Sequence, residues 1–468
     1  MKLSFSYNYL GDWYLKITVK DVVENTSCKL LIGNLDEEVK ECFIDSKKVK
    51  EEGCFIGIKG NKTDGSLYYK EAFNNKASIC ILNKILDLDL NGYDDKTVLI
   101  ANDTKQVLKE LAMYKRSLFK GTVVGITGSV GKTSTKELIY NVLEKKYKVL
   151  KTKGNENSQI GLPLTITRLK DEDVMVLEMG MNDFNQIHNL SLIAKPDIAI
   201  ITNIYDSHIG ILGSRENILK AKLEILDGMD NKTVIVNNDN DLLNNWAKTC
   251  NEEKIITYGI NNESDYMATD IKEREIISFN VKNIDNISAS STAFIYNKLA
   301  AIIVGKILNV SDNDIKKGIN EDIKIKHRLE EIKLKGDITI IDDCYNASFE
   351  SVKNALSYIN KKDGRKILIL GDILELGKRS KQIHRKIGTL ISNCAYLITI
   401  GKWSKYISKE ARKNGLKKKY VKHFKNVSIA KKYILSIIKP NDNVLIKASN
   451  AVNLSELVNY LKESEIDN

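Results

Sequence analysis

Residues 122–137 read TVVGITGSVGKTSTKE, and this stretch decides the fold of the middle of the chain. Its opening β-branched run predicts a short strand buried in a parallel sheet. Gly128–Gly131 then interrupts the strand, and apolar residues follow at helical spacing from Leu138 onward. Strand, glycine loop and helix together form an arrangement that binds phosphate, because backbone N–H groups and the positive end of the helix face the phosphate oxygens.

The loop predicts a nucleotide site with two side-chain roles. Lys132 is placed to reach the β- and γ-phosphates of ATP, and the Thr133 hydroxyl is placed to hold Mg²⁺. The general pattern has a glycine where Ile126 stands, so a tight turn with a chance Gly-Lys-Thr is the alternative. The strand and helix that flank the loop favour the nucleotide site. Its other expected members are Thr127, Gly128, Ser129, Val130 and Gly131.

Composition is that of an ordinary soluble protein. The 468 residues are 43% hydrophobic and 28% charged, and they suffice for two to four domains of about 100–200 residues each. The net charge of +11 comes largely from scattered lysines, which favours anionic substrates such as nucleotides. Because the aromatic residues are not interleaved with a basic patch, we expect no nucleic-acid partner.

Cysteine usage and hydropathy indicate the compartment. The seven cysteines are odd in number and contain no CxxC pair, which argues against a disulfide framework and a zinc site. Residues 1–16 lack the apolar core and cleavage site of a signal peptide. No stretch is apolar for long enough to span a bilayer. We therefore expect a cytoplasmic protein without membrane insertion, and a monomer.

The order of predicted elements indicates an α/β protein of three domains. Residues 1–117 show two short strands and two helical patterns, which predict a small N-terminal α/β domain. Residues 118–325 alternate strand and helix, as in a central parallel sheet with helices on both faces around the phosphate loop. Residues 326–468 alternate in the same way and predict a small doubly wound, Rossmann-like sheet.

Polar residues follow three predicted strands of the middle domain at their carboxyl ends. Lys132 follows the first strand, Glu178 follows Val174–Leu177, and His208 lies shortly after Ile198–Thr202. In open α/β sheets ligands bind outside these ends, so we expect the three side chains to converge on one rim. A carboxylate there binds Mg²⁺ beside phosphates. A solvated acid at 178 and a surface histidine at 208 are the alternatives.

A lysine on the apolar face of a helix is the other unusual feature. The helix predicted over Arg215–Asp227 has Ile218 and Ile225 on its apolar stripe, and Lys222 lies on the same stripe. A lysine on a buried face is paired, neutral or chemically altered. The alternative is a side chain that extends along the stripe to solvent.

Seven motifs, in order, resemble those of the Mur ligases. They are 125–133 (GITGSVGKT), 154–157 (GNEN), 178–182 (EMGMN), 201–214 (ITNI through His208 to LGS), 221–225 (AKLEI), 342–347 (DDCYNA) and 371–377 (GDILELG). They span almost the whole chain, and the displaced glycine of the phosphate loop is the form that this family uses. The resemblance implies an ATP-dependent amide ligase of peptidoglycan synthesis, whose domains in order hold a UDP-sugar, bind ATP and close over the site.

Within this family, EMGMN and GDILELG look most like the members that join D-alanyl-D-alanine to UDP-N-acetylmuramoyl-tripeptide. The resemblance implies that the tripeptide carboxylate attacks the γ-phosphate of ATP, and that the amine then attacks the resulting acyl phosphate. It also implies metal ligands: Thr133 and Glu178 would hold one Mg²⁺, His208 would hold a second, and a carbamylated Lys222 would be an acidic group near the metal. The catalytic residues that it implies are Lys132, Glu178, His208 and Lys222. The nucleotide contacts that it implies outside the loop are Asn297, Arg328 and Asp343. The substrate contacts that it implies are Ser46, Lys47, Asn155, Asn157 and Ser158.

Several residues depart from the family pattern where substrate is handled. Lys47 stands in place of an arginine that would offer a bidentate fork, and Ser158 stands where asparagine is common. Further departures are Asp183, Ala293, Phe349 and the stretch 447–450. The ATP and metal residues are intact, so these changes bear on the substrate more than on the reaction. Two alternatives stay open: a related ligase with a different amine donor or acceptor, and a nucleotide-binding homologue that has lost catalysis.

Overall fold

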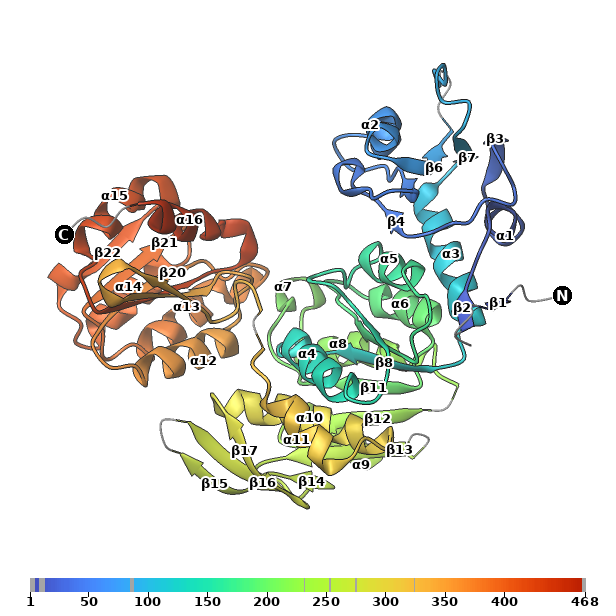
Figure 1. The fold of residues 1–468 in the computed structure, drawn as a ribbon. Coiled ribbons are helices and arrows are strands. Elements are labelled where there is room, and N and C mark those ends of the chain that lie inside the picture. Colours follow the sequence, from blue (N-terminus) through green and yellow to red (C-terminus); the bar gives the residue numbers. More distant parts are fainter. Residues whose placement is uncertain are drawn as a thin grey trace.

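The computed structural model describes residues 5–7, 13–84, 88–230, 232–251, 254–273, 276–323 and 325–464. Much of the N-terminal stretch that was expected to contain no signal peptide lies outside these residues. The described residues form five sheets, the smallest of which pairs β1 (Phe5–Tyr7) with β2 (Trp13–Leu15). Figure 1 shows the N-terminal and C-terminal parts on different sides of a central part that carries the phosphate loop.

The central sheet, as far as the structure describes it, has seven strands, all parallel, in the order β14-β13-β12-β11-β8-β10-β9. The strands are β8 (Thr122–Thr127), β9 (Val149–Lys151), β10 (Val174–Glu178), β11 (Ile198–Ile201), β12 (Thr233–Asn237), β13 (Lys254–Gly259) and β14 (Tyr266–Met267). This confirms the predicted parallel sheet. The strand that precedes the phosphate loop, β8, lies between β10 and β11.

Side chains of these strands alternate between two cores, because the sheet is buried on both faces. Val123, Met175 and Ala199 belong to one core, and Val124 and Ile200 belong to the other. The first core is covered by α5 (Gly161–Thr167), α6 (Gln186–Ala194), α8 (Arg215–Leu223) and α9 (Asp241–Thr249), and the second by α4 (Lys132–Leu143), α10 (Thr292–Ile307) and α11 (Asp312–Asn320). Helices therefore cover both faces, as predicted.

The N-terminal sheet has the order β3-β7-β6-β5-β4, and β3 pairs antiparallel with β7 while the other pairs are parallel. Its elements are α1 (Val19–Asn25), β3 (Lys29–Ile32), β4 (Cys42–Phe43), β5 (Gly53–Ile56), α2 (Tyr69–Asn74), β6 (Ala77–Asn83), β7 (Thr97–Ala101) and α3 (Thr104–Leu118). Helix α3 also packs against α5 and α6 of the central part. The domain boundary predicted after residue 117 falls in the last turn of α3 and stays a prediction, as does the boundary predicted after residue 325.

The C-terminal sheet has the order β18-β19-β23-β20-β21-β22 and is parallel except for β18 at its edge. Its strands are β18 (Glu330–Leu334), β19 (Ile338–Asp343), β20 (Arg365–Gly371), β21 (Tyr396–Ile400), β22 (Val421–Phe424) and β23 (Asp442–Lys447). One face is covered by α12 (Phe349–Asn360), α13 (Ser380–Thr389) and α14 (Lys405–Lys413), and the other by α15 (Val427–Ile437) and α16 (Ser455–Glu463). The doubly wound prediction is confirmed, with β18 as an addition.

A three-stranded antiparallel sheet beside α10 was not predicted. It consists of β15 (Thr269–Glu273), β16 (Ile277–Val281) and β17 (Ile284–Ala289). The strands are short and rich in polar residues, and only the alternation of ISFNV in β16 is typical of a half-buried strand. Within the described part of the chain, no helix has the length and apolar character that crossing a membrane requires.

The core position of β11 gives a first testable expectation. The side chain of Ile200 is fully buried at the centre of the sheet. Ile200→Ala leaves a cavity, so we expect the free energy of unfolding to fall by about 2–5 kcal/mol, measured by urea denaturation. The matched variant Ile429→Ala, at a position that is 59% exposed on α15, should change it by less than about 0.5 kcal/mol. Equal losses in the two variants would contradict this description of the core.

Candidate active site

The phosphate loop follows β8 and precedes α4. Gly128 and Gly131 have φ angles of +145° and +84°, which residues with a Cβ atom rarely adopt. A Cβ on Gly128 would lie 1.9 Å from Thr202 Oγ1, and one on Gly131 would lie 2.9 Å from Asn297 Oδ1. By contrast, Ile126 is a fully buried residue within β8, so a glycine is not needed there. The displaced glycine therefore reflects where the chain bends.

Asn203, at the carboxyl end of β11, shapes the loop. The Ser129 N–H donates to the Asn203 carbonyl and the Val130 N–H donates to Asn203 Oδ1, both over 2.9 Å. These two amides are therefore engaged within the protein. The N–H groups in the first turn of α4, among them those of Lys132 and Thr133, lack intrahelical acceptors and can donate to phosphate oxygens. Asn203 is a site residue that sequence analysis missed, although its place after a strand was a usable signal.

Glu178 lies at the centre of a small polar network. Its side chain is 1% exposed, and Thr133 Oγ1 donates to Glu178 Oε2 over 3.0 Å. Asn157 Nδ2 donates to the other carboxylate oxygen over 2.8 Å. Lys132 lies on the same loop and donates from Nζ to the Gly128 carbonyl over 2.8 Å. The structure thus brings together the residues predicted at the ends of β8 and β10, and a solvated acid at 178 is excluded by this burial.

Two lysines, the half-buried Lys132 and the buried Lys222, belong to this region. Burial lowers the pKa of Lys132, although Glu178 opposes the shift, and Arg328 lowers it further. Lys222 is 2% exposed, and the described residues provide it with no hydrogen-bond or ion-pair partner. Burial, and secondarily the positive charge of Lys132, hold the pKa of Lys222 well below its usual range. The lysine predicted on the apolar stripe is therefore buried, and burial disfavours its charged form.

His208 lies beside the same loop and contacts the C-terminal part of the chain. It begins α7 (Ile209–Leu212) with a φ of +61°. The preceding Ser207 hydroxyl donates to the Ser129 carbonyl over 3.5 Å, which places this segment against the phosphate loop. The Nδ1 atom of His208 is hydrogen-bonded to Glu375 Oε2 from the loop after β20. That partner was part of a recognised motif but was not predicted to meet His208.

Of the other predicted nucleotide contacts, Asn297 and Arg328 lie near the loop. Asn297 Oδ1 accepts from the Thr135 hydroxyl over 3.3 Å beside Gly131. The Arg328 guanidinium carbon lies 4.1 Å from the centroid of the Tyr345 ring, and its charge acts on Lys132. Asp343 pairs with the buried Lys447 over 2.7 Å. Burial raises the pKa of Asp343, while Lys447 opposes that shift.

The predicted substrate contacts are spread over two parts of the chain. The Ser46 hydroxyl donates to Glu71, and Lys47 is exposed, both in the N-terminal part. Asn155 is exposed, and Ser158 Oγ accepts from the Gly161 N–H over 3.3 Å at the start of α5. Of this set, Asn157 is the member that the described hydrogen bonds tie to Glu178. The sequence alone did not distinguish it from its neighbours.

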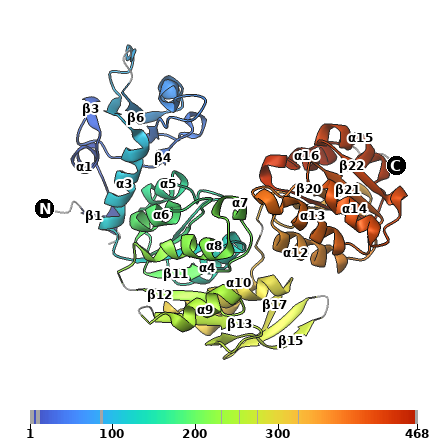
Figure 2. The same cartoon turned by 180° about the vertical axis from the view of Figure 1, so that it is seen from behind.

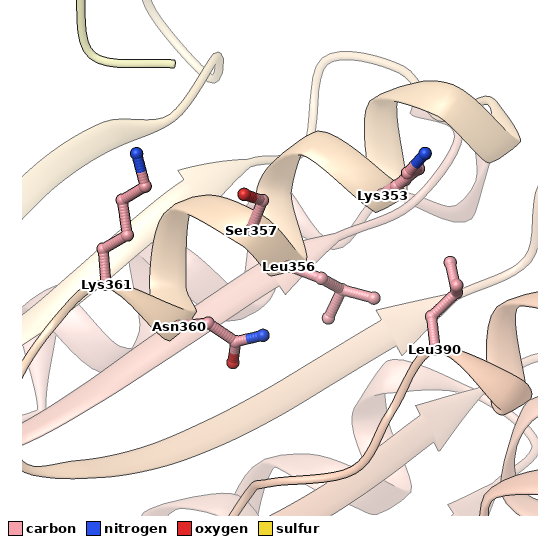
Figure 3. A pocket seen from close by; sticks show the side chains of 6 residues that line it. All are labelled: Lys353, Leu356, Ser357, Asn360, Lys361 and Leu390. Carbon is pink, nitrogen blue, oxygen red and sulfur yellow. The ribbon is translucent and has the colours of Figure 1, made fainter. Parts of the chain in front are cut away.

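Two surface hollows lie outside this site. One, of about 380 Å³, is lined by Lys353, Leu356, Ser357, Asn360, Lys361 and Leu390, which come from α12 and the end of α13 (Figure 3). The other, of about 440 Å³, is lined by Lys409, Arg412, Lys413, Leu416 and Lys418. Neither contains a predicted site residue. Basic side chains also surround Tyr406, so the lysines are less evenly scattered than the sequence indicated.

Comparison with known proteins agrees with this geometry. Residues 126–305 match the family model of the Mur ligase middle domain, and residues 327–450 match that of the Mur ligase, glutamate ligase domain. The chain belongs to the Mur ligase family, and it is a ligase enzyme.

The most similar relatives share one name. The chain is 35% identical to UDP-N-acetylmuramoyl-tripeptide--D-alanyl-D-alanine ligase of Bacillus subtilis, over 97% of this chain and 100% of that protein. It is 28% identical to the Escherichia coli enzyme of the same name, over 90% and 93% of the two chains. MurF from Acinetobacter baumannii has a similar structure, with a TM-score of 0.82, 25% identity and coverage of 96% and 99%. MurF ligase from Thermotoga maritima in complex with ADP gives a TM-score of 0.74 at 27% identity, over 91% and 97%.

The glycine at 131 gives a test of the nucleotide site. Gly131→Ala places a methyl group against Asn297 and strains a φ of +84°. We expect ADP to bind at least about tenfold more weakly, a change of about 1.4 kcal/mol, measured by isothermal titration calorimetry. Gly415→Ala introduces a similar strain at φ +100° with no atom within 4 Å, and it should leave ADP affinity unchanged. Unaltered affinity in Gly131→Ala would place the nucleotide elsewhere.

Proposed function

We propose that this ligase joins D-alanyl-D-alanine to UDP-N-acetylmuramoyl-tripeptide, with ATP converted to ADP and phosphate. The observation that carries the proposal is the network of Thr133, Glu178 and Asn157 at the phosphate loop, in a chain whose similarity to ligases of that name extends over 97% of its length. All substrates are small molecules, which suits a cytoplasmic monomer, and that is the state we infer.

The first step activates the tripeptide. A carboxylate oxygen attacks the γ-phosphorus of ATP, the bond from that phosphorus to the β–γ bridging oxygen breaks, and ADP leaves. Lys132 and the N-terminus of α4 would neutralise charge on the phosphates. Arg328 would add a second cation, because its charge already acts on Lys132. Asn297, beside Gly131, would contact the adenine, and Asp343 the ribose.

The second step forms the amide bond. A carboxylate is a poor acylating agent because its oxide is a poor leaving group, whereas phosphate leaves readily from the acyl phosphate. The amine nitrogen of D-alanyl-D-alanine attacks the carbonyl carbon, the tetrahedral intermediate expels phosphate, and the amine proton is released. Ser46 and Lys47 would hold the UDP portion of the acceptor, and Asn155, Asn157 and Ser158 would position its peptide.

One Mg²⁺ would be held by Thr133 and Glu178, and a second by His208. The first two already place oxygen atoms 3.0 Å apart, and this cation prefers oxygen ligands. When bound, it supplies positive charge to phosphate oxygens that carry the developing negative charge. The Asn157 amide, which donates to the second oxygen of Glu178, would fix the orientation of that carboxylate.

Lys222 would act as a carbamate. Its side chain is buried, and an unpaired ammonium ion would be costly there. Reaction of the neutral amine with carbon dioxide forms an N–C bond and releases a proton, which replaces a cation with an anion. An anion beside Lys132 would be paired rather than repelled, and it would add an acidic oxygen to the site.

Product mass tests the reaction directly. With ATP, Mg²⁺, UDP-N-acetylmuramoyl-tripeptide and D-alanyl-D-alanine, we expect a product heavier than the acceptor by the dipeptide less one water, detected by mass spectrometry. Lys132→Ala should reduce the rate at least about 100-fold, because it removes charge stabilisation from the transferred phosphoryl group. A panel of single amino acids and dipeptides is the control for specificity.

Each other outcome of that assay selects an alternative. Reaction with a different amine, and none with D-alanyl-D-alanine, would identify a related ligase. A wild-type chain that turns over no ATP with any acceptor would indicate a homologue that has lost catalysis.

Carbamylation of Lys222 predicts chemical rescue. Lys222→Ala should lose most activity, and short carboxylic acids such as acetate should restore part of it, because they replace the lost anion. Depletion of bicarbonate should lower wild-type activity. Lys136 is a matched control: it is fully buried and donates to the Thr152 carbonyl over 2.7 Å, so activity lost in Lys136→Ala should not be rescued. Insensitivity of the wild type to bicarbonate, without rescue of Lys222→Ala, would exclude the carbamate.

A further inference from the structure

The central and C-terminal parts of the chain meet at α7, the helix that follows His208 (Figures 1 and 2). Glu375 is one of the residues that join them. Its carboxylate is hydrogen-bonded to His208 Nδ1, and its carbonyl accepts from the Gly210 N–H over 2.8 Å. One residue of the C-terminal part therefore holds both a side chain and the backbone of α7. The motif around Glu375, 371–377, has no assigned role in the proposed reaction.

The backbones of the two parts lie close together around Glu375. A Cβ on Gly210 would lie 2.5 Å from Gly377 N, and a Cβ on Gly377 would lie 2.9 Å from Gly210 Cα. Glu375 and His208 have φ angles of +62° and +61°, a region that non-glycine residues seldom occupy. Such conformations persist where surrounding contacts over-determine them, often at functional sites. The contact is therefore specific in geometry.

A second ion pair crosses the same contact without touching His208. Arg379 lies 3.6 Å from Asp206, and both side chains are partly exposed. Exposed pairs of this kind contribute little to stability. Arg379 belongs to the turn that packs against α7, so it shares the docking contact with Glu375. It therefore provides a matched control that separates docking from any effect on the imidazole.

The chemistry of the pair fixes a tautomer. An ionised carboxylate only accepts hydrogen bonds, so Nδ1 of His208 must carry the proton that it shares with Glu375. In a neutral imidazole the other nitrogen, Nε2, then holds the lone pair. Which nitrogen binds a ligand is set by the hydrogen bond that the other one makes. Histidines that bind metals commonly have a carboxylate partner of this kind.

We propose that Glu375 is a positioning residue that sets the tautomer and orientation of His208 from across the domain contact. The central site is then complete only when the C-terminal part is docked on α7. The positioning is a property of the free protein. One consequence rests on the proposed function: cation binding and turnover then depend on a residue of the other domain.

Histidine NMR of the full chain, without nucleotide or metal, tests the positioning directly. With ¹⁵N-labelled histidine, and the His208 signals assigned from a His208→Gln variant, we expect protonated Nδ1 and unprotonated Nε2 in the wild type. Glu375→Ala should shift His208 towards the opposite tautomer, and Arg379→Ala should keep the wild-type signals. Glu375→Gln, whose amide oxygen still accepts from Nδ1, should retain the wild-type tautomer. Unchanged His208 signals in Glu375→Ala would overturn the proposal.

Dependence on Mg²⁺ tests the consequence. In the ligase assay, Glu375→Ala should raise the Mg²⁺ concentration for half-maximal rate at least about tenfold, in line with outer-shell partners of metal-binding histidines. Arg379→Ala should not raise it. An equal rise in both variants would reduce Glu375 to a docking residue and overturn the proposal. If the wild type proved inactive with every acceptor while the tautomer still depended on Glu375, the positioning would stand and the proposed function would fail.

Discussion

Parallel pairing of β8 with β10 and β11 is the constraint on which the site depends. Because the three strands are adjacent and parallel, the segments that follow them leave the sheet at one edge. The register then selects the face. Glu178 pairs opposite Ile126 and, with Val176, points to the side that α4 covers, where the Thr133 hydroxyl donates a hydrogen bond to it. A shift of one residue would turn the carboxylate to the other face, away from the helix.

Lys132 and Arg328 place positive charge at this edge of the sheet, which suits it to anionic ligands. Burial lowers the pKa of both Lys132 and Lys222, and the charge of Lys132 lowers the pKa of Lys222 further. Arg328 adds a further cation, whereas Glu178 is the carboxylate whose charge acts on Lys132. A site with this imbalance gains electrostatic stabilisation when anionic groups enter. Phosphates and carboxylates, the groups that the proposed reaction handles, have that charge.

The C-terminal part takes a direct place in the site. Arg328 and Tyr345 lie at the start of that part and interact with Lys132 and Glu178 of the central part. The contact through Glu375 and Gly377 follows the carboxyl end of β20. Ligands bind outside the carboxyl ends of parallel strands, so the ends of the two sheets that suit ligand binding face each other here. The arrangement makes domain docking part of site assembly, because residues needed near the phosphates come from both sides.

The sequence by itself determined the elements that carry strong periodicity or chemistry. The strand, glycine loop and helix around Lys132 were predictable because β-branched runs and glycines have local causes, and the burial of Lys222 followed from its position on an apolar stripe. The strands β15–β17 were not predictable, because short polar strands depend on partners distant in the chain. Only the tertiary structure decided that Asn203 closes the phosphate loop, that Asn157 supports Glu178, and that Glu375 meets His208. These contacts join residues 21 to 167 positions apart, and local patterns contain no information on which distant side chains will meet.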